Sequence, residues 1–224
     1  MIEVDGVSHR LGEHLALAGV TVAFTEHRVG VIGANGSGKS TFARLLNGLV
    51  VPDTGRVLVD GLSTSKDGRE IRRKVGFVFT DPDAQIVLPT VGEDVSFGLR
   101  RAGLPRTEVA ERVRDVLARH GLGGFEDRPA HLLSGGEKQL LALCAVLVTE
   151  PATLVCDEPT TLLDLRNARR IAATLAALPQ RLVLVTHDLD RLADFDRVLV
   201  FDGGRLVADD RPAPAVAAYL DLLR

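Results

Sequence analysis

The stretch GVIGANGSGKST, which begins at Gly30, carries the residue types that bind phosphate. Glycine has no Cβ, so its backbone can turn successive N–H groups toward one point, where phosphate oxygens can accept from them. Lys39 follows the last glycine and can reach the same phosphate groups. The alternative is a glycine-rich turn with a chance lysine. We interpret the stretch as a phosphate-binding loop made of Gly33, Ala34, Asn35, Gly36, Ser37, Gly38, Lys39, Ser40 and Thr41.

The segments on either side of this loop favour phosphate binding. Residues 28–32 are mostly apolar and β-branched, which is typical of a buried strand. Apolar residues recur at helical spacing after Lys39, and Gly48 predicts the end of that helix. A strand, a glycine loop and a helix together form the context of the Walker A motif. This motif predicts that Lys39 binds the β- and γ-phosphates of a nucleotide and that Ser40 binds Mg²⁺.

Two acidic residues follow another apolar strand, at residues 154–156. Asp157 is the predicted Walker B acid, which would hold Mg²⁺ mainly through its water shell. Glu158 could take a proton from an attacking water molecule. Acids stand at strand ends by chance quite often, so the interpretation depends on the accompanying Walker A motif.

A second candidate anion site begins at Ser134, where Ser-Gly-Gly precedes an apolar helix. That helix should end before Pro151, because the residue before proline avoids helical geometry. The start of a helix offers free N–H groups and, here, a hydroxyl. The alternative is a plain helix cap with glycines in the turn. Taken alone the cap would be the better interpretation, but a chain with two anion sites needs an explanation.

The segment LSGGEKQ resembles the signature sequence of ATP-binding-cassette (ABC) ATPases, and Asp157 follows it in the order usual for that family. The resemblance extends over nearly the whole chain. In that family two nucleotide-binding subunits pack head to tail, and the signature of one covers the γ-phosphate held by the other. The resemblance therefore implies a homodimer with a signature in trans, made of Leu133, Ser134, Gly135, Gly136 and Glu137.

Two further residues occupy positions that matter in this family. Asp164 stands where the family's D-loop lies, and His187 follows the predicted strand at residues 182–185. A single histidine at a strand end is usually structural. In this order of motifs the resemblance implies that His187 is the switch histidine, which holds the γ-phosphate beside Glu158.

Residues 79–85 and 89–98 resemble the ATPases of energy-coupling-factor importers, which take up vitamins and transition-metal ions. Residues 158–167 and the short segment after the motifs resemble the biotin-importer ATPases within that group. We therefore expect a membrane-embedded coupling subunit and a substrate-binding subunit as partners. Gln85 belongs to the subgroup's own pattern and is predicted, with Glu93 and Asp94, to couple the chain to its partner. Glu93 and Asp94 are predicted to form a groove for a basic helix of the coupling subunit.

The chain departs from the family pattern at two places. Thr80 stands where the family usually has a glutamine that ligates Mg²⁺; its hydroxyl could ligate the ion but is shorter. The family also places an aromatic residue near the amino terminus to stack on adenine, and residues 7–11 contain none. His9 or Leu11 would pack there instead, which predicts loose selectivity for the base.

Composition limits the other possibilities. The formal net charge of −3 argues against a nucleic-acid-binding protein. The longest apolar run, residues 140–148, is too short to span a bilayer. The two cysteines have apolar neighbours, so a reducing compartment fits better than a disulfide framework. We therefore expect a peripheral protein at the cytoplasmic face of the cell membrane, held there by its partners.

The expected fold is α/β, with a P-loop core, an antiparallel β-subdomain and a helical insert from about residue 85 to residue 148, all within one ABC domain of residues 1–224. The expected function is hydrolysis of MgATP to drive an energy-coupling-factor importer, with biotin as the solute. The alternatives are import of cobalt, nickel or another vitamin, a soluble ABC ATPase not tied to transport, and a P-loop phosphotransferase. A phosphotransferase would leave residues 133–137 without a purpose.

Overall fold

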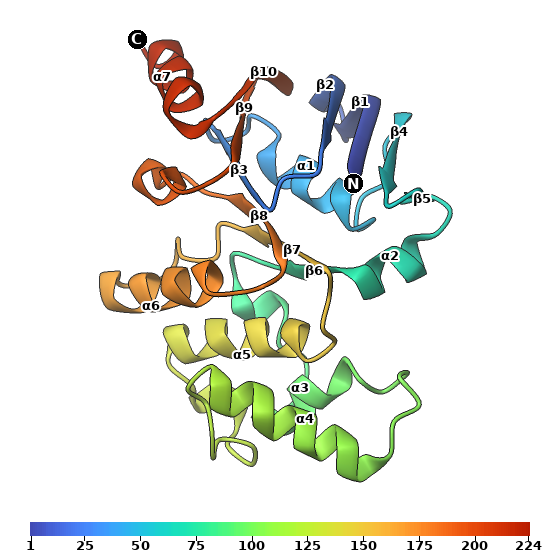
Figure 1. Cartoon of the computed structure of the whole chain (residues 1–224), viewed down its shortest axis with the longest axis vertical. Helices are drawn as coiled ribbons and strands as arrows, with labels where there is room; N and C mark the ends of the chain where they lie inside the picture. The colour runs from blue at the N-terminus through green and yellow to red at the C-terminus, as the bar shows by residue number, and fades with distance from the viewer. The chain divides into compact units, whose positions relative to one another are not determined.

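The computed structural model describes all residues from Met1 to Arg224, and the chain forms two compact units. Unit 1 contains Met1–Phe77, Ala152–Glu158 and Gln180–Arg224. Unit 2 contains Val78–Pro151 and Pro159–Pro179. The predicted helical insert lies within unit 2, drawn mostly in green and yellow in Figure 1. None of the helices has both the length and the apolar character needed to cross a bilayer.

The larger sheet of unit 1 has the strand order β10-β9-β3-β8-β7-β6. The central strand β3 (Arg28–Gly33) pairs in parallel with β8 (Arg181–Val185) and β9 (Arg197–Asp202), and β7 (Thr153–Asp157) pairs in parallel with β8. The edge strands are β6 (Val75–Val78) and β10 (Arg205–Asp210), the latter antiparallel to β9. The inner strands are almost entirely buried, which explains their near-continuous apolar sequences.

Helices of unit 1 pack on this sheet. α1 (Lys39–Leu46) contacts β3, β7 and β8, and α7 (Pro212–Leu222) contacts β9, β10 and β3. Below α7 lies a small buried cluster, and a short 3₁₀ helix, η3 (Leu189–Leu192), adds Leu192 to it; the other members are Ile32, Val198, Val200 and Ala215. This packing fixes the carboxyl ends of the parallel strands.

A second sheet of unit 1 has the order β2-β1-β4-β5 and is antiparallel. It consists of β1 (Ile2–Leu11), β2 (His14–Phe24), β4 (Thr54–Val59) and β5 (Leu62–Ser63). Burial alternates along the second half of β2, as expected for a strand with one face on the core. The short helix α2 (Gly68–Lys74) follows and contacts β5. The predicted antiparallel β-subdomain is confirmed.

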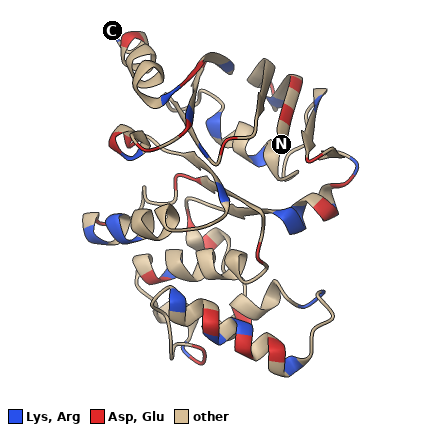
Figure 2. Ribbon diagram, in the orientation of Figure 1, with Lys and Arg blue, Asp and Glu red and all other residues tan.

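Unit 2 is helical and is built around α5 (Gly135–Leu147). α5 contacts α3 (Val91–Phe97), α4 (Arg106–Arg119), α6 (Leu165–Ala176) and the 3₁₀ helix η1 (Pro82–Ala84); a second 3₁₀ helix, η2 (Ala130–Leu132), precedes α5. In Figure 1, α5 lies between α6 and α4. Basic and acidic residues alternate along α4, whereas the charges of α5 are confined to its start (Figure 2). A helix that is apolar on every side is a buried one.

Candidate functional site

Three parallel neighbours, β3, β8 and β7, end at the same edge of the large sheet. Val31 in β3 and Asp157 in β7 are both in register with Val185 in β8. The predicted phosphate loop follows β3. Asp157 ends β7 and Glu158 follows it, and Thr186 and His187 follow β8. Ligands of α/β proteins bind at such carboxyl edges. The sheet therefore brings together the residues of unit 1 that the sequence singles out.

The loop has a shape that only glycine allows at two positions. Gly38 has a φ of 101°, and a Cβ there would lie 2.4 Å from the carbonyl oxygen of Ala16 in β2. Gly33 has a φ of 150°, and a Cβ there would lie 2.1 Å from the carbonyl oxygen of Phe201 in β9. The backbones of β2 and β9 therefore lie against the loop at these two glycines and restrict its conformation.

Several donors of the loop are left for a ligand. The helix α1 has Gly38 as its N-cap, with no side chain bonded to its first N–H groups. The hydroxyl of Ser37 is buried and has no hydrogen-bond partner. Lys39 donates from Nζ to the carbonyl oxygens of Gly33 and Ala34, both at 2.8 Å. A buried cation, an uncapped helix start and an unpartnered hydroxyl form a donor set that fits phosphate.

Burial also changes the pKa of Lys39. It is lowered, chiefly because burial penalises the charged ammonium, while the charges of Glu158 and Asp157 oppose the shift. An anion bound in the loop would favour the charged form in the same way.

Ser40 and Asp157 lie in contact at the loop's end. The Ser40 hydroxyl donates to Asp157 Oδ1 at 2.8 Å, and a guanidinium nitrogen of Arg44 lies 3.7 Å from Oδ2. The pKa of Asp157 is raised, mainly by burial, against the opposing effects of Ser40 and Arg44. No cluster of three or more acidic, histidine or cysteine side chains forms a metal site. A hydroxyl and one carboxylate nevertheless fit Mg²⁺, which usually takes one or two protein ligands together with substrate phosphates and water.

Glu158 and His187 lie side by side at the ends of β7 and β8. Glu158 has a φ of 48°, a conformation that residues other than glycine rarely adopt, and its N–H donates to the carbonyl oxygen of Val185 at 3.0 Å. His187 Nδ1 lies 3.5 Å from Glu158 Oε2. Strained backbone of this kind is concentrated at functional sites. The turn directs Glu158 away from the strand and toward His187.

The predicted signature stands at the start of α5 in unit 2. Ser134 is the N-cap, and Glu137 completes a capping box: its carboxylate accepts from the N–H and from the hydroxyl of Ser134, both at 2.7 Å. Leu133 and Gly136 are buried, whereas Ser134 and Gly135 are exposed. A Cβ on Gly136 would lie 2.4 Å from the Asn167 side chain, so α6 approaches the helix start closely.

Asp164, the predicted D-loop residue, is the N-cap of α6. Its side chain accepts from the N–H of Asn167 at 2.8 Å and from its amide nitrogen at 2.9 Å. These bonds lower the pKa of Asp164, with the backbone bond from Asn167 as the largest cause. Asn167 therefore links the D-loop residue to the signature glycine, Gly136.

The segment that contains Thr80 is fastened to α5 by side chains. Gln85 accepts from the N–H of Phe79 and donates to the carbonyl oxygen of Ala142, both at 3.1 Å. Gln139 donates to the carbonyl oxygen of Phe79 at 3.1 Å, and an ion pair of 2.7 Å joins Lys138 to Asp83 in η1. Gln85 is thus an internal clamp. Sequence reasoning missed Gln139, although a glutamine inside an apolar helix is itself a signal of a buried bond.

Glu93 and Asp94 differ in their surroundings. Glu93 is exposed and completes a capping box with Thr90 at the start of α3. Asp94 is buried, and its Oδ1 accepts from the N–H groups of Val87 and Leu88 at 2.8 and 3.0 Å. Asp94 therefore shapes the preceding loop, and of the pair only Glu93 presents its carboxylate at the surface.

The candidates for packing against the base lie at the end of β1. His9 is half-buried, with Nδ1 3.5 Å from Asp53 Oδ1, and Leu11 is 54% exposed. His9 is not fully exposed and Leu11 is not aromatic, so neither residue offers an exposed aromatic ring for stacking on a base.

Residues 19–161 match the family model described as ABC transporter. The chain belongs to the ABC transporter family. The match contains the phosphate loop, the signature, Asp157 at the end of β7 and Glu158 directly after it. The predicted ATPase of a transport system is thereby confirmed, and the phosphotransferase alternative is excluded.

Curated relatives of this ABC chain carry several transport names. It is 49% identical to the biotin transport ATP-binding protein BioM of Rhizobium etli, over 99% of this chain and 98% of the relative. It is 43% identical to the cobalt import ATP-binding protein CbiO of Syntrophus aciditrophicus, over 95% and 79%. It is 40% identical to the energy-coupling factor transporter ATP-binding protein EcfA1 of Halalkalibacterium halodurans, over 83% and 68%.

A solved structure gives the same architecture. The ATP-binding cassette MJ0796, in a dimeric post-hydrolysis state bound to ADP and phosphate, superposes with a TM-score of 0.82 at 27% identity. The superposition covers 95% of this chain and 99% of that one. The predicted α/β fold of an ABC ATPase is confirmed.

Proposed function

We propose that this ABC chain is the ATP-hydrolysing subunit of an energy-coupling-factor importer and that the imported solute is biotin. The observation that carries the ATPase mechanism is the shared edge of β3, β8 and β7, where Lys39, Asp157, Glu158 and His187 gather. The biotin assignment is supported by the high identity to a biotin transport ATP-binding protein. Cobalt is the alternative solute, because a relative named for cobalt import is also similar.

The loop residues bind the phosphates. The N–H groups of residues 33–41 surround the phosphate oxygens, and Lys39 exchanges its bonds to Gly33 and Ala34 for the β- and γ-phosphates. We assign Mg²⁺ to Ser40 and Asp157, which already lie in contact at the end of the loop. When bound, Mg²⁺ supplies positive charge that neutralises phosphate oxygens.

Hydrolysis is assigned to Glu158 and His187. Glu158 accepts the proton of the attacking water, a step that usually contributes about 10²–10⁴-fold to the rate. His187 lies within 3.5 Å of Glu158 and donates to the γ-phosphate, which keeps the water and the phosphate in line. Charge stabilisation by the loop donors contributes the rest.

We further propose that two copies of the chain pack head to tail, each as a single ABC domain of residues 1–224. Leu133, Ser134, Gly135, Gly136 and Glu137 of one copy would complete the phosphate site of the other, with Asp164 between the two sites. The dimeric state of the similar cassette MJ0796 supports this arrangement.

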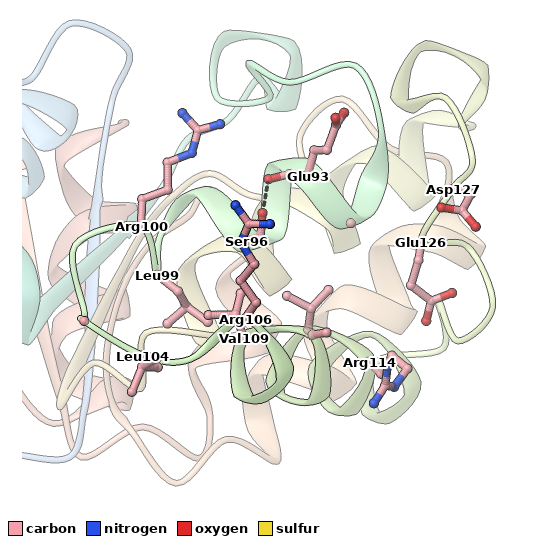
Figure 3. A pocket seen from close by; sticks show the side chains of 14 residues that line it. Glu93, Ser96, Leu99, Arg100, Leu104, Arg106, Val109, Arg114, Glu126 and Asp127 are labelled. Atoms are coloured by element: carbon pink, nitrogen blue, oxygen red, sulfur yellow. Dashed lines mark hydrogen bonds between the residues drawn. The ribbon is translucent and has the colours of Figure 1, made fainter.

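A cavity of about 930 Å³ in unit 2 is the proposed contact with the membrane partner. Apolar residues of α4 and of the segment before it form part of its lining, and acidic and basic side chains surround them (Figure 3). Glu93 lies on one side and Glu126 and Asp127 on another, so an arginine of a partner helix could pair with these carboxylates. Asp94, next to Glu93 in α3, accepts from the N–H groups of Val87 and Leu88, and Gln85 donates to Ala142 of α5, so we assign both a role in holding the segment before α3 rather than in contact with the partner.

The partner would be a membrane-embedded coupling subunit, which in turn would hold a substrate-binding subunit. The ATPase would then lie at the cytoplasmic face of the cell membrane. Co-purification followed by uptake of labelled biotin, cobalt or nickel would identify the solute. A chain that hydrolyses ATP but binds no membrane subunit would contradict the proposed coupling.

Mixing two inactive variants tests the head-to-tail dimer. Lys39→Ala removes one phosphate site, and Ser134→Arg places a bulky cation in the signature. A mixed dimer combines one intact phosphate loop with one intact signature, so we expect the mixture to regain ATP hydrolysis that neither variant has alone. An inactive mixture of folded, dimerising variants would contradict the trans arrangement.

A further inference from the structure

Both polar donors of Ser134 are occupied within unit 2. Its N–H and its hydroxyl donate to the same oxygen, Glu137 Oε2, and each bond is 2.7 Å long. The return bond of the capping box, from the N–H of Glu137 to Ser134 Oγ, is longer at 3.4 Å. The bonds from Ser134 to the Glu137 carboxylate are therefore shorter than the bond from the Glu137 N–H to the Ser134 hydroxyl.

This arrangement conflicts with the proposed role of Ser134. A hydroxyl has one proton to donate. When that proton is directed at Glu137, it cannot be donated to the γ-phosphate of the opposite subunit. Glu137 and the phosphate are both anions, so an approaching phosphate would also meet the repulsion of the carboxylate.

Protonation of Glu137 does not remove the conflict near neutral pH. The bonds from Ser134, first the hydroxyl and then the backbone N–H, lower the pKa of the Glu137 carboxyl. Charges from Arg128 and Arg170 act in the same direction. The side chain is therefore a carboxylate when the subunits meet.

Arg128 offers the carboxylate another partner. One of its guanidinium nitrogens, Nη1, lies 3.4 Å from Glu137 Oε1, the oxygen that Ser134 does not use. The guanidinium also lies over the ring of Phe125, with its central carbon 4.6 Å from the ring centroid. Contact with the ring keeps this cation near the start of α5.

We propose that Glu137 sets the ATP concentration at which two subunits close. Its carboxylate competes with the phosphate of the opposite subunit for the Ser134 hydroxyl, and Arg128 takes the carboxylate when the phosphate arrives. This inference rests on the proposed head-to-tail dimer. Glutamine at position 137 would accept the same two bonds from Ser134 without the negative charge.

The alternative is that Glu137 only caps α5, as glutamate does in many capping boxes. The two roles differ in their consequences. A pure cap affects the stability of α5 and leaves the ATP dependence of dimer formation unchanged. A competing anion affects the ATP dependence, and its effect depends on Arg128.

The experiment uses the full chain with Glu158→Gln, which slows hydrolysis, and follows dimer formation by light scattering during a titration with MgATP. We expect Glu137→Gln to lower the midpoint of the titration about fivefold, which corresponds to about 1 kcal/mol. Arg128→Met should raise the midpoint, and it should have no effect when Glu137→Gln is also present. The matched control is Glu108→Gln, which removes the acid of another glutamate–arginine pair in unit 2 and should leave the midpoint unchanged.

The outcomes separate the inference from the proposed function. A dimer whose midpoint is unchanged or raised by Glu137→Gln overturns the competition while leaving the proposed function intact. An effect of Arg128→Met that persists without the carboxylate also overturns it. If the chain forms no ATP-dependent dimer at all, both the inference and the proposed function are wrong. Thermal unfolding of each variant verifies that the variants are folded.

Discussion

Two helices of this molecule, α1 and α5, begin at proposed phosphate sites, and they begin in opposite ways. α1 follows Gly38, which has no side chain to cap it, and the nearby hydroxyl of Ser37 is buried without a partner. α5 follows Ser134, whose donors are both bonded to Glu137. At the start of α1 no side chain caps the helix, whereas at the start of α5 the donors of the N-cap residue are bonded to a residue of the same helix.

The difference teaches how each site can meet its ligand. A buried polar group without a partner costs about 1–3 kcal/mol, so the loop before α1 is stabilised when a phosphate fills it. α5 has no such deficit and is stable without a ligand. Under this proposal, a site that binds nucleotide within one subunit can leave its donors without a protein partner. A site completed only in a dimer is more stable in the monomer when its donors are bonded within the subunit.

The largest effect should come from the sheet edge beside α1. Glu158→Gln removes the proposed base and should slow hydrolysis about 10²–10⁴-fold, the usual contribution of a general base. ATP binding should persist, and the ATP-bound dimer should accumulate. Single-turnover hydrolysis of labelled ATP measures the rate, and a variant that keeps half of the wild-type rate would contradict the assignment.

A matched pair of alanines tests whether glycine is needed at both helix starts. Gly38→Ala places a Cβ 2.4 Å from the Ala16 carbonyl oxygen in a strained conformation, which should cost about 1–3 kcal/mol. At Gly135 the nearest atom, in Leu163, would be 3.9 Å from the new Cβ, so Gly135→Ala should change the stability by less than about 0.5 kcal/mol. Urea unfolding of the apo protein measures both, and equal losses would remove this distinction.

The cap of α5 should have a smaller contribution. Ser134→Ala removes the side chain that caps the helix and should lower the free energy of unfolding by about 1 kcal/mol, whereas Ser134→Gly should lower it by only a few tenths. Both changes should act equally with and without nucleotide in the monomer, since no ligand is bound at α5 there. A loss that appears only in the presence of ATP would argue that the cap has no role of its own.

The smallest effect concerns the two thiols, one in each unit. Burial raises the pKa of Cys144 in unit 2 to about 12, and burial together with the charge of Asp157 raises the pKa of Cys156 in unit 1. Neither thiol should react with a thiol reagent in the folded protein at neutral pH, because the reactive form is the thiolate.

Residual labelling of these cysteines can compare the two units. MgATP added to the monomer should slow the labelling of Cys156 and leave that of Cys144 unchanged, because the nucleotide stabilises only the site in unit 1. Mass spectrometry of the labelled peptides gives both rates. Equal slowing would mean that the units open together, and the comparison of α1 with α5 would then not extend to their stability.

Local signals in the sequence were enough for the elements that carry the phosphate loop. The β-branched run at residues 28–32 predicts most of β3, and the spacing of apolar residues at 107–120 predicts α4, observed as Arg106–Arg119. The predicted start of α5 near Ser134 is likewise confirmed. In each case neighbouring residues alone determine the element.

Other features depend on residues distant in the sequence and could not be predicted. The predictions did not include β10, and α3 and α6 are further helices that the spacing did not reveal. Asp94 stands in the first turn of a helix, where an acid is normally exposed, but here its side chain is buried and accepts from the N–H groups of Val87 and Leu88. The bond of Gln139 to Phe79 likewise needs knowledge that two segments 60 positions apart meet.

The order of the segments has a consequence for synthesis. The central strand of unit 1, β3, has β8 and β9 as its sheet neighbours, and both are made after Pro179, the last residue of unit 2. All residues of unit 2 are therefore synthesised before β3 can pair with either neighbour. A strand with two unpaired edges favours aggregation. The proposed phosphate loop also depends on a residue made late, because the N–H of Gly204 donates to the carbonyl oxygen of Ser37 at 3.1 Å. The phosphate loop is thus among the first segments to be synthesised and among the last to acquire its final contacts.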